Sequence, residues 1–239
     1  FPHLRLWVLV PVKVWREIVR IGVPSAVQNL IYAGISMILT RLITGWGDLA
    51  VAAQRVGSQI ESVSWMVGDG FSAAVNAFLG QNYGAKRYDR VLESFWFCLK
   101  VAVTLLTTLG VVSFFGAEAI MGVFRKGDLE VIRIGTWAMR FQCLTLPFQA
   151  WIIMSNMLTQ SIGYGFRASI VAAGRQGIFL IPALLTLPGF LGILGLQLCQ
   201  PIADVCTSVM AAVIVVSILK ELRAWNEEMQ NLSKKTMDE

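Results

Sequence analysis

Long apolar runs separated by short polar segments dominate the chain. A helix that crosses a bilayer needs about 20 mostly apolar residues. Six runs reach that length, at residues 18–43, 49–79, 95–124, 134–162, 168–187 and 193–219. The pattern therefore predicts an all-α, polytopic membrane protein, with a bundle of six transmembrane helices over residues 18–219. We expect residues 1–17 to form an interfacial leader and residues 220–239 to form a charged cytoplasmic tail, itself a helix.

Polar side chains inside three of these runs recur at helical spacing. Steps of three or four residues place them on one helix face. They are Ser25, Gln28, Asn29, Tyr32, Ser36 and Thr40 in the first run, Gln54, Ser58, Glu61, Trp65, Asp69, Ser72 and Asn76 in the second, and Gln142, Thr145, Gln149, Asn156 and Gln160 in the fourth. Lipid cannot satisfy such groups, so these faces meet either water or other helices.

Three polar faces favour an aqueous substrate cavity over hydrogen bonding between helices, although the same residue types serve both purposes. The residues that we expect to line this cavity are Gln28, Asn29, Tyr32, Gln54, Ser58, Trp65, Asn76, Gln149, Trp151 and Asn156. Of these, Tyr32, Trp65 and Trp151 have aromatic rings that can stack on flat cationic molecules.

Glu61 is the most informative single residue. It lies roughly 18 Å along the second run at 1.5 Å per residue, near the bilayer centre. An ionised carboxyl group is costly there unless a cation accompanies it. We therefore predict that Glu61, with Asp69 two turns further on, holds the coupling cation. The alternative for both is a structural carboxyl group, and for Asp204, which follows Pro201 in the sixth run, the structural role is favoured because proline frees a backbone carbonyl.

The charge pattern supports this topology. Only 15% of the residues are charged, against about 25% in soluble domains, and the net charge is +5. Of the 20 basic residues, 14 fall on the side that holds the termini, Arg167 and Arg175 among them. Basic loops mark the cytoplasmic side, so we expect both termini in the cytoplasm, at the plasma (inner) membrane. The basic excess then faces anionic lipid, and nucleic acid is not an expected partner.

The chain lacks the residues of several kinds of enzyme. His3 is the single histidine, which argues against histidine-based catalysis and zinc hydrolysis. The segment from Gly80 to Arg87 misses the phosphate-loop spacing, which argues against ATP hydrolysis. The four cysteines lie in apolar runs without metal-type pairing, so we expect them to be reduced. We therefore predict a protein that is not an enzyme, without cofactor or bound metal, driven by a Na⁺ or H⁺ gradient.

The segment from Phe78 to Arg90 resembles a cytoplasmic loop motif of the multidrug and toxic compound extrusion (MATE) transporters. Its matching residues are Gly80, Gln81, Asn82, Gly84 and Arg90, and supporting similarity lies at 21–24, 57–62, 174–177 with Pro182, and 200–204. The resemblance implies one six-helix lobe, the C-terminal one, of a twelve-helix secondary antiporter. Such transporters export drugs or organic cations in exchange for Na⁺ or H⁺, and the N-terminal lobe would be the partner.

The resemblance does not supply an ion site. One bacterial branch of the family carries a glutamate in the first helix of this lobe, where Tyr32 stands here, and an aspartate in the fourth helix, where residues 149–151 hold no carboxylate. Two alternatives stay open. One is a flippase of lipid-linked precursors, which would need a strongly basic cavity. The other is a six-helix fragment or homodimer that does not transport alone.

Overall fold

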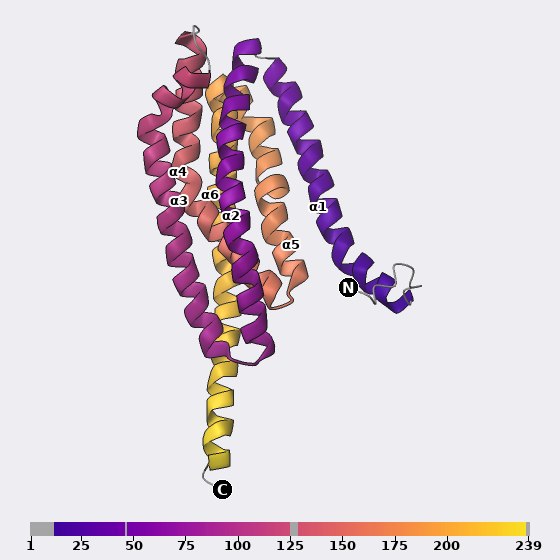
Figure 1. The fold of residues 1–239 in the computed structure, drawn as a ribbon. Coiled ribbons are helices and arrows are strands. Elements are labelled where there is room, and N and C mark those ends of the chain that lie inside the picture. The colour runs from indigo at the N-terminus through magenta and orange to yellow at the C-terminus, as the bar shows by residue number, and fades with distance from the viewer. Residues whose placement is uncertain (1–11, 46, 125–128, 238–239) are drawn as a thin grey trace, which may run out of the picture.

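The structure is a computed structural model that describes residues 12–45, 47–124 and 129–237. Every regular element in this part of the chain is helical. In chain order they are α1 (Val12–Thr44), α2 (Asp48–Gly84), α3 (Tyr88–Phe124), α4 (Leu129–Ser161), α5 (Gly165–Ala173), the π-helical turn η1 (Gly174–Ile178) and α6 (Leu180–Met237). Figure 1 shows an elongated bundle with α1 along one edge and the last part of α6 extending beyond the other helices.

Gly192 divides α6 into a short first part, Leu180–Gly192, and a long second part that contains the membrane-length stretch Leu194–Asn231. Its φ of 60° and ψ of −135° are non-helical and suit only glycine at low energy, so the chain reverses direction here. Gly195 then packs so closely on the carbonyl group of Leu187 that a Cβ atom would not fit. The α5–η1 segment with the first part of α6 is thus one spanning unit, and the rest of α6 is another. The described chain therefore forms six long helical segments, as the hydropathy pattern predicts.

The buried core lies mainly where α2, α3, α4 and the second part of α6 meet. Leu79, Phe95, Met154, Leu158 and Leu222 are among its fully or almost fully buried members. A second apolar cluster joins α1 to α6 through residues that include Ile43 and Leu184. Because lipid is as apolar as these side chains, close packing rather than exclusion of water holds such helices together. The central position of α4 makes its side chains the natural place for contacts between helices.

The predicted loop from Gly80 to Arg90 is shorter in the structure, and this part of the prediction is wrong. Helix α2 continues through Gly84 and α3 begins at Tyr88, which leaves only residues 85–87 between them. Lys86 adopts φ 57°, and the amides of Lys86 and Arg87 donate to the carbonyls of Tyr83 and Asn82. This is the Schellman arrangement, which satisfies the last helical carbonyls and allows so short a turn.

Two helical stretches of the described residues, Tyr88–Gly122 and Leu194–Asn231, are long and apolar enough to cross a membrane by length and composition alone. Helix α1 already begins at Val12, inside the predicted leader, and α6 runs without a break from residue 219 to Met237. The predicted tail is helical, and no helix end marks the boundary at 219. Residues 1–11 lie outside the described part.

Candidate functional site

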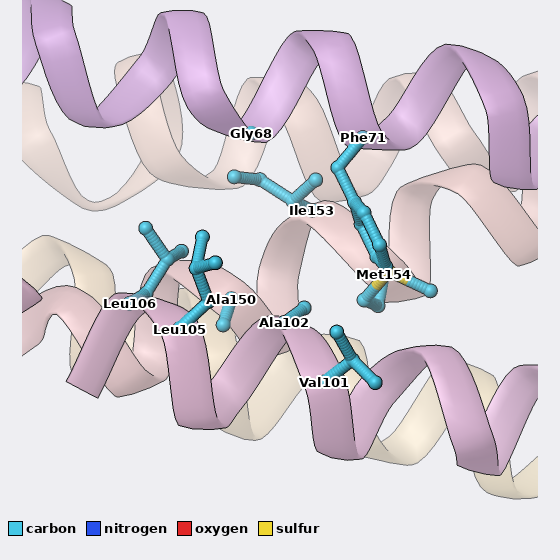
Figure 2. A pocket seen from close by; sticks show the side chains of 9 residues that line it. All are labelled: Gly68, Phe71, Val101, Ala102, Leu105, Leu106, Ala150, Ile153 and Met154. Atoms are coloured by element: carbon cyan, nitrogen blue, oxygen red, sulfur yellow. The ribbon is translucent and has the colours of Figure 1, made fainter. Parts of the chain in front are cut away.

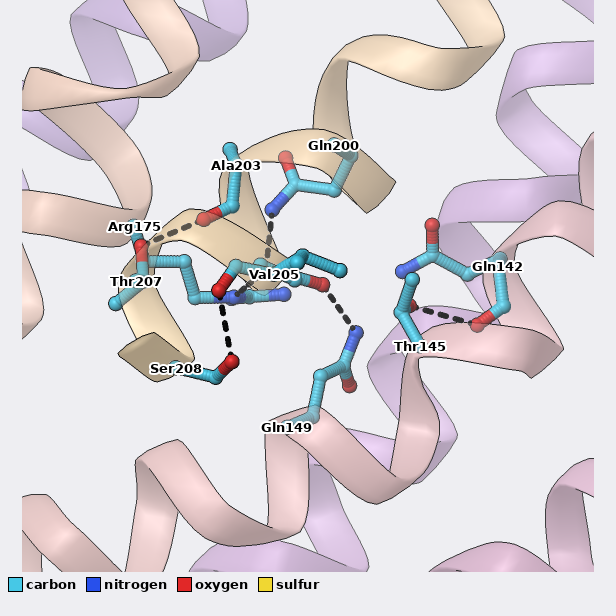
Figure 3. A network of polar contacts seen from close by, with 10 residues as sticks. Gln142, Thr145, Gln149, Arg175, Gln200, Ala203, Val205, Thr207 and Ser208 are labelled. Carbon is cyan, nitrogen blue, oxygen red and sulfur yellow. Dashed lines mark hydrogen bonds and ion pairs between the residues drawn. The ribbon is translucent and has the colours of Figure 1, made fainter. Parts of the chain in front are cut away.

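The most developed polar site is a buried ion pair between Arg175 of η1 and Asp204 of α6. Arg175 Nε lies 2.6 Å from Asp204 Oδ1, and the two side chains are only 4% and 0% exposed. Gln149 of α4 donates to Asp204 Oδ2 at 3.0 Å, and Gln200 donates to Oδ1 at 3.2 Å. Figure 3 shows Gln149, Arg175 and Gln200 reaching toward one another from α4, η1 and α6. The site therefore ties α4, η1 and α6 together.

The local backbone explains how these groups meet. In η1 the amide of Phe179 donates to the carbonyl of Gly174 at 3.0 Å, a bond that spans five residues and widens the helix by one residue. Gly174 packs against the Met210 side chain so tightly that a Cβ atom would displace it. The absence of a side chain at Gly174 lets η1 approach α6 closely, and the next residue, Arg175, reaches Asp204.

This network is suited to holding helices in place. The opposite charges of Arg175 and Asp204 cancel, and three N–H donors fill most of the acceptor sites of the carboxylate. A carboxylate neutralised by a guanidinium group has little remaining attraction for a metal cation. The geometry therefore supports the structural role predicted for Asp204. The arrangement also corrects one expectation, because Arg175 is buried in the bundle rather than exposed with the basic residues near the termini.

The sequence interpretation did not pair Arg175 with Asp204. One signal was present, since each is an isolated charged residue in an apolar run and their charges are opposite. Buried charges of this kind are normally paired. The pairing itself depends on how two distant segments pack, which periodicity within one helix does not report.

A second, more exposed cluster lies at the tail end of the bundle, the end that carries the short turns at 85–87 and 162–164. Glu221 of α6 accepts a hydrogen bond from Tyr164 Oη at 2.8 Å and forms an ion pair with Arg167 at 3.2 Å. The guanidinium carbon of Arg167 lies 4.5 Å from the centroid of the Tyr164 ring. The hydrogen bond to Glu221, with burial and the charge of Glu221, raises the pKa of Tyr164 above its usual 10.0.

Aromatic rings extend this cluster to the α2–α3 turn. Tyr83 and Tyr88 flank that turn, and both pack on Trp225 of α6, with ring centroids 6.3 and 5.6 Å away. Burial, with the neighbouring Tyr88 and Glu221, raises the pKa of Tyr83. The turn, the α4–α5 connection and the tail of α6 are thus joined at one place.

The residues of the predicted loop motif lie in or next to the α2–α3 turn. Asn82 Nδ2 donates to the carbonyl of Phe78 at 2.8 Å, and the carbonyl of Gln81 accepts the amide of Ala85. Gly80 lies inside α2, Gly84 is its last residue, and Arg90 is exposed on α3. These hydrogen bonds of Gln81 and Asn82 lie within the last turns of α2, and a binding role for the motif stays a prediction.

Five of the predicted site residues from α2 and α4 lie in different environments. Asp69 is exposed, Asn76 is half-buried, and Asn156 is half-buried with its Oδ1 accepting from Gln160 at 3.1 Å. Trp151 is turned into the lobe, where its indole N–H donates to the carbonyl of Ser208 at 3.1 Å. Gln149 is committed to Asp204 as described. The contacts of Gln149 and Trp151 are hydrogen bonds between helices. The assignment of these five residues to a substrate cavity or a cation site stays a prediction.

The side chains of the other predicted residues lie outside the described part of the structure. They are Glu61, Gln28, Asn29, Tyr32, Gln54, Ser58 and Trp65. The backbone of α1 and α2 is helical around them, so the spacing that places each set on one face holds. Their roles stay predictions.

An apolar cavity of about 30 Å³ lies between α2, α3 and α4. Figure 2 shows its lining, which includes Gly68, Phe71, Leu105, Ile153 and Met154. The cavity is far too small for a drug-sized molecule, and no polar side chain lines it. It is a packing defect near the close approach of Gly68 to Ile153 rather than a substrate site. Among the described residues no group of three His, Cys, Asp or Glu side chains is placed to hold a metal ion.

The bundle and its buried network define a polytopic helical membrane protein, and comparison with known proteins identifies which kind. The MatE family model matches residues 24–186, more than half of the chain, so the chain belongs to the MatE family. Members of this family are transporters rather than enzymes.

Individual relatives agree with this assignment. The chain is 28% identical over 129 residues to a probable multidrug resistance protein NorM of Thermotoga maritima, covering 53% of this chain and 27% of that protein. It is 22% identical over 211 residues to an FAD transporter of Shewanella oneidensis, covering 88% of this chain and 46% of that one. The structure of the Vibrio cholerae MATE transporter VcmN in the bent form matches with a TM-score of 0.81 at 18% identity, over 91% of this chain and 49% of that one. The chain thus spans about half the length, or less, of these relatives.

Proposed function

We propose that this chain forms the C-terminal six-helix lobe of a cation-coupled secondary antiporter that exports drugs or organic cations. The observation that carries the proposal is the match of nearly the whole chain, 91%, to half of a MATE transporter structure. The N-terminal lobe of the same transporter would be its partner. Transporters are commonly built from two such repeats around a site at the bilayer midplane.

The distribution of basic residues supports an orientation with both termini in the cytoplasm. Once buried Arg175 is removed from the 14 residues on the side of the termini, 13 remain against six on the other side. The excess still follows the positive-inside rule. The tail-end cluster around Glu221 would then face the cytoplasm, at the plasma (inner) membrane.

We place the substrate cavity along the polar faces of α1 and α2. Gln149 and Trp151 already donate hydrogen bonds within the lobe, so α4 has fewer groups free for a substrate. The proposed coupling residues are Glu61, near mid-span on α2, and Asp69, which is exposed on the same helix. A carboxylate on a wet helix face can exchange a proton or a sodium ion when the cavity opens to alternate sides.

The test is Glu61→Gln in the complete transporter, with drug resistance of the host cells as the readout. We expect loss of resistance at unchanged expression, because the amide keeps the shape of the side chain and removes its charge. Glu227→Gln, an exposed carboxylate in the tail of α6, is the matched control and should leave resistance intact. Undiminished resistance in the Glu61 variant would refute the coupling assignment.

A second candidate function is export of a flavin dinucleotide. It is favoured by the similarity to the FAD transporter, which extends over 88% of this chain. Transport of labelled FAD and of an organic cation into inverted vesicles separates the two functions. A flippase of lipid-linked phosphates is less well supported, since Asp204 neutralises Arg175 and leaves the buried network without excess positive charge.

A further inference from the structure

Among the described residues, Arg140 is a charged residue with a buried N–H group that has no hydrogen-bond partner. It lies on α4, about 16 Å along the axis from Leu129 at 1.5 Å per residue. Its guanidinium carbon lies 5.5 Å from the ring centroids of both Phe114 and Trp137. These rings attract the charge of the guanidinium group, yet they do not replace a hydrogen-bond acceptor.

Two buried polar atoms at this place lack acceptors or donors among the described residues. Arg140 Nε is buried and has no hydrogen-bond partner, and the same holds for Thr136 Oγ1 one helical turn away. A buried N–H of a charged group that is left unpaired costs about 1–3 kcal/mol or more. An acceptor from outside the lobe would remove that penalty.

An apolar groove runs from Arg140 between α3 and α4. Its volume is about 220 Å³, and its lining is Thr107, Gly110, Val111, Phe114, Phe115, Cys143, Leu144 and Pro147. Phe114 therefore both contacts Arg140 and forms part of the groove. The groove is accessible from outside the lobe, because Phe115 and Leu144 in its lining are exposed.

The groove has a definite structural origin. A Cβ atom on Gly110 would lie only 3.0 Å from the carbonyl oxygen of Cys143, so α3 and α4 approach closely here. Pro147 cannot donate to that carbonyl, since proline has no N–H. Missing side-chain volume at Gly110 and the disturbed helix at Pro147 leave the space beside them.

The surrounding charges favour an anion at the level of Arg140. Arg133, Trp137, Arg140 and Leu144 follow each other at steps of four, three and four residues, so they share one face of α4. Glu118 on α3 is exposed and forms no ion pair with either arginine in the structure. Two positive charges beside one negative charge leave a net attraction for anions. An exposed Trp137 next to arginine is also typical of the level where lipid headgroups meet hydrocarbon.

We propose that the α3–α4 groove binds a phospholipid, whose phosphate accepts hydrogen bonds from Arg140 and whose acyl chain lies along the groove. The site belongs to the leaflet at the end of the bundle away from the tail of α6. Guanidinium groups pair strongly with phosphate, which explains why arginine rather than lysine suits this position. The proposal concerns lipid contact alone and does not depend on the transported substrate.

The experiment is native mass spectrometry of the full-length transporter in detergent, titrated with palmitoyl-oleoyl phosphatidylglycerol. We expect Arg140→Gln to weaken binding of one lipid molecule by about tenfold, the loss expected for a charge-assisted hydrogen bond. Arg223→Gln, an exposed arginine on the tail of α6, is the matched control and should leave the affinity unchanged. Glu118→Gln removes a nearby negative charge, so it should leave the affinity for the lipid unchanged or raise it.

A second variant addresses the groove itself. Leu144→Trp fills the groove from an exposed position while Arg140 stays in place, and it should displace the same lipid molecule. Lipid retention in Arg140→Gln and in Leu144→Trp that equals retention in the parent protein would overturn the proposal. So would cross-linking from position 144 to the other lobe or to a second copy of the chain, because the groove would then be covered by protein.

Discussion

Two arginine–carboxylate pairs among the described residues of the lobe lie in contrasting surroundings. Arg175 and Asp204 meet at 2.6 Å with side chains 4% and 0% exposed, whereas Arg167 and Glu221 meet at 3.2 Å with side chains 39% and 32% exposed. Both pairs join a guanidinium group to a carboxylate, but the first pair is buried among helices and the second is partly exposed to water. In the first pair each charge depends on the other for stabilisation, while water competes for both charges in the second.

The difference shows that burial determines how much an ion pair contributes to stability. Breaking a buried pair leaves a charge without compensation, whereas an exposed pair contributes little because water solvates the separated ions. The buried pair also has help from Gln149 and Gln200, and the exposed pair from Tyr164. We therefore expect Arg175 and Asp204 to determine whether the helices pack correctly, and Arg167 and Glu221 to adjust the tail end.

The largest effect should come from removing one buried partner. Asp204→Asn leaves the guanidinium group of Arg175 without its counter-ion and should lower the unfolding free energy by about 3–5 kcal/mol. Denaturation in mixed detergent micelles, followed by tryptophan fluorescence, measures this loss. A variant as stable as the parent would mean that the pair is not desolvated in the assembled protein.

Removing both charges should be much less harmful. The double variant Arg175→Met, Asp204→Leu replaces the pair by apolar side chains, a change that is often neutral or stabilising. We expect it to recover most of the stability lost in either single variant, which gives a large coupling energy in the double-mutant cycle. Additive losses would show that each residue acts through other partners.

A smaller effect is expected at Gln149. Gln149→Met keeps the approximate volume and removes the donor to Asp204 Oδ2, so about 1–3 kcal/mol of stability should be lost. This variant also sharpens the assignment of Gln149. Loss of stability at unchanged substrate affinity indicates a purely structural residue, whereas weaker substrate binding at unchanged stability supports the predicted role in the cavity.

The smallest effect should follow changes in the exposed pair. Arg167→Gln or Glu221→Gln should change the unfolding free energy by about 0.2–1 kcal/mol, and added salt should reduce the difference further. Measurements at low and high salt, made in parallel with the Asp204 variant, provide the comparison. If Glu221→Gln lowers the unfolding free energy by several kcal/mol and salt does not change that loss, the pair of Arg167 and Glu221 behaves as a buried pair, and the contrast is wrong.

The sequence predicted the six helical segments well, because long apolar runs report directly on residues that lipid can accept. The prediction was less successful for a polar segment that the structure shows to be helical. Gln81, Asn82 and Gly84 have the composition of a loop, yet they form the last turn of α2 because the Schellman turn at Lys86 completes the helix. The charged tail, by contrast, was predicted to be helical, and α6 does continue to Met237.

The buried network was harder to foresee. Asp204 was predicted to be structural from Pro201 alone, and its actual partner Arg175 was assigned to the wrong environment. The π turn of η1 adds one residue to the helix, so positions after Gly174 are rotated relative to a regular helix. Regular periodicity does not anticipate such a rotation, because the contact of Gly174 with Met210 is tertiary.

The part of α6 beyond the bundle has a mechanical consequence. From Lys220 to Met237 it forms a continuous rod, about 27 Å long at 1.5 Å per residue, with Trp225 packed on Tyr83 and Tyr88 near its base. A rod fixed at its base is a lever arm. Each tilt of the lobe by about 10° carries its tip through roughly 5 Å, and a force applied at that tip acts on the lobe through the full length of the rod.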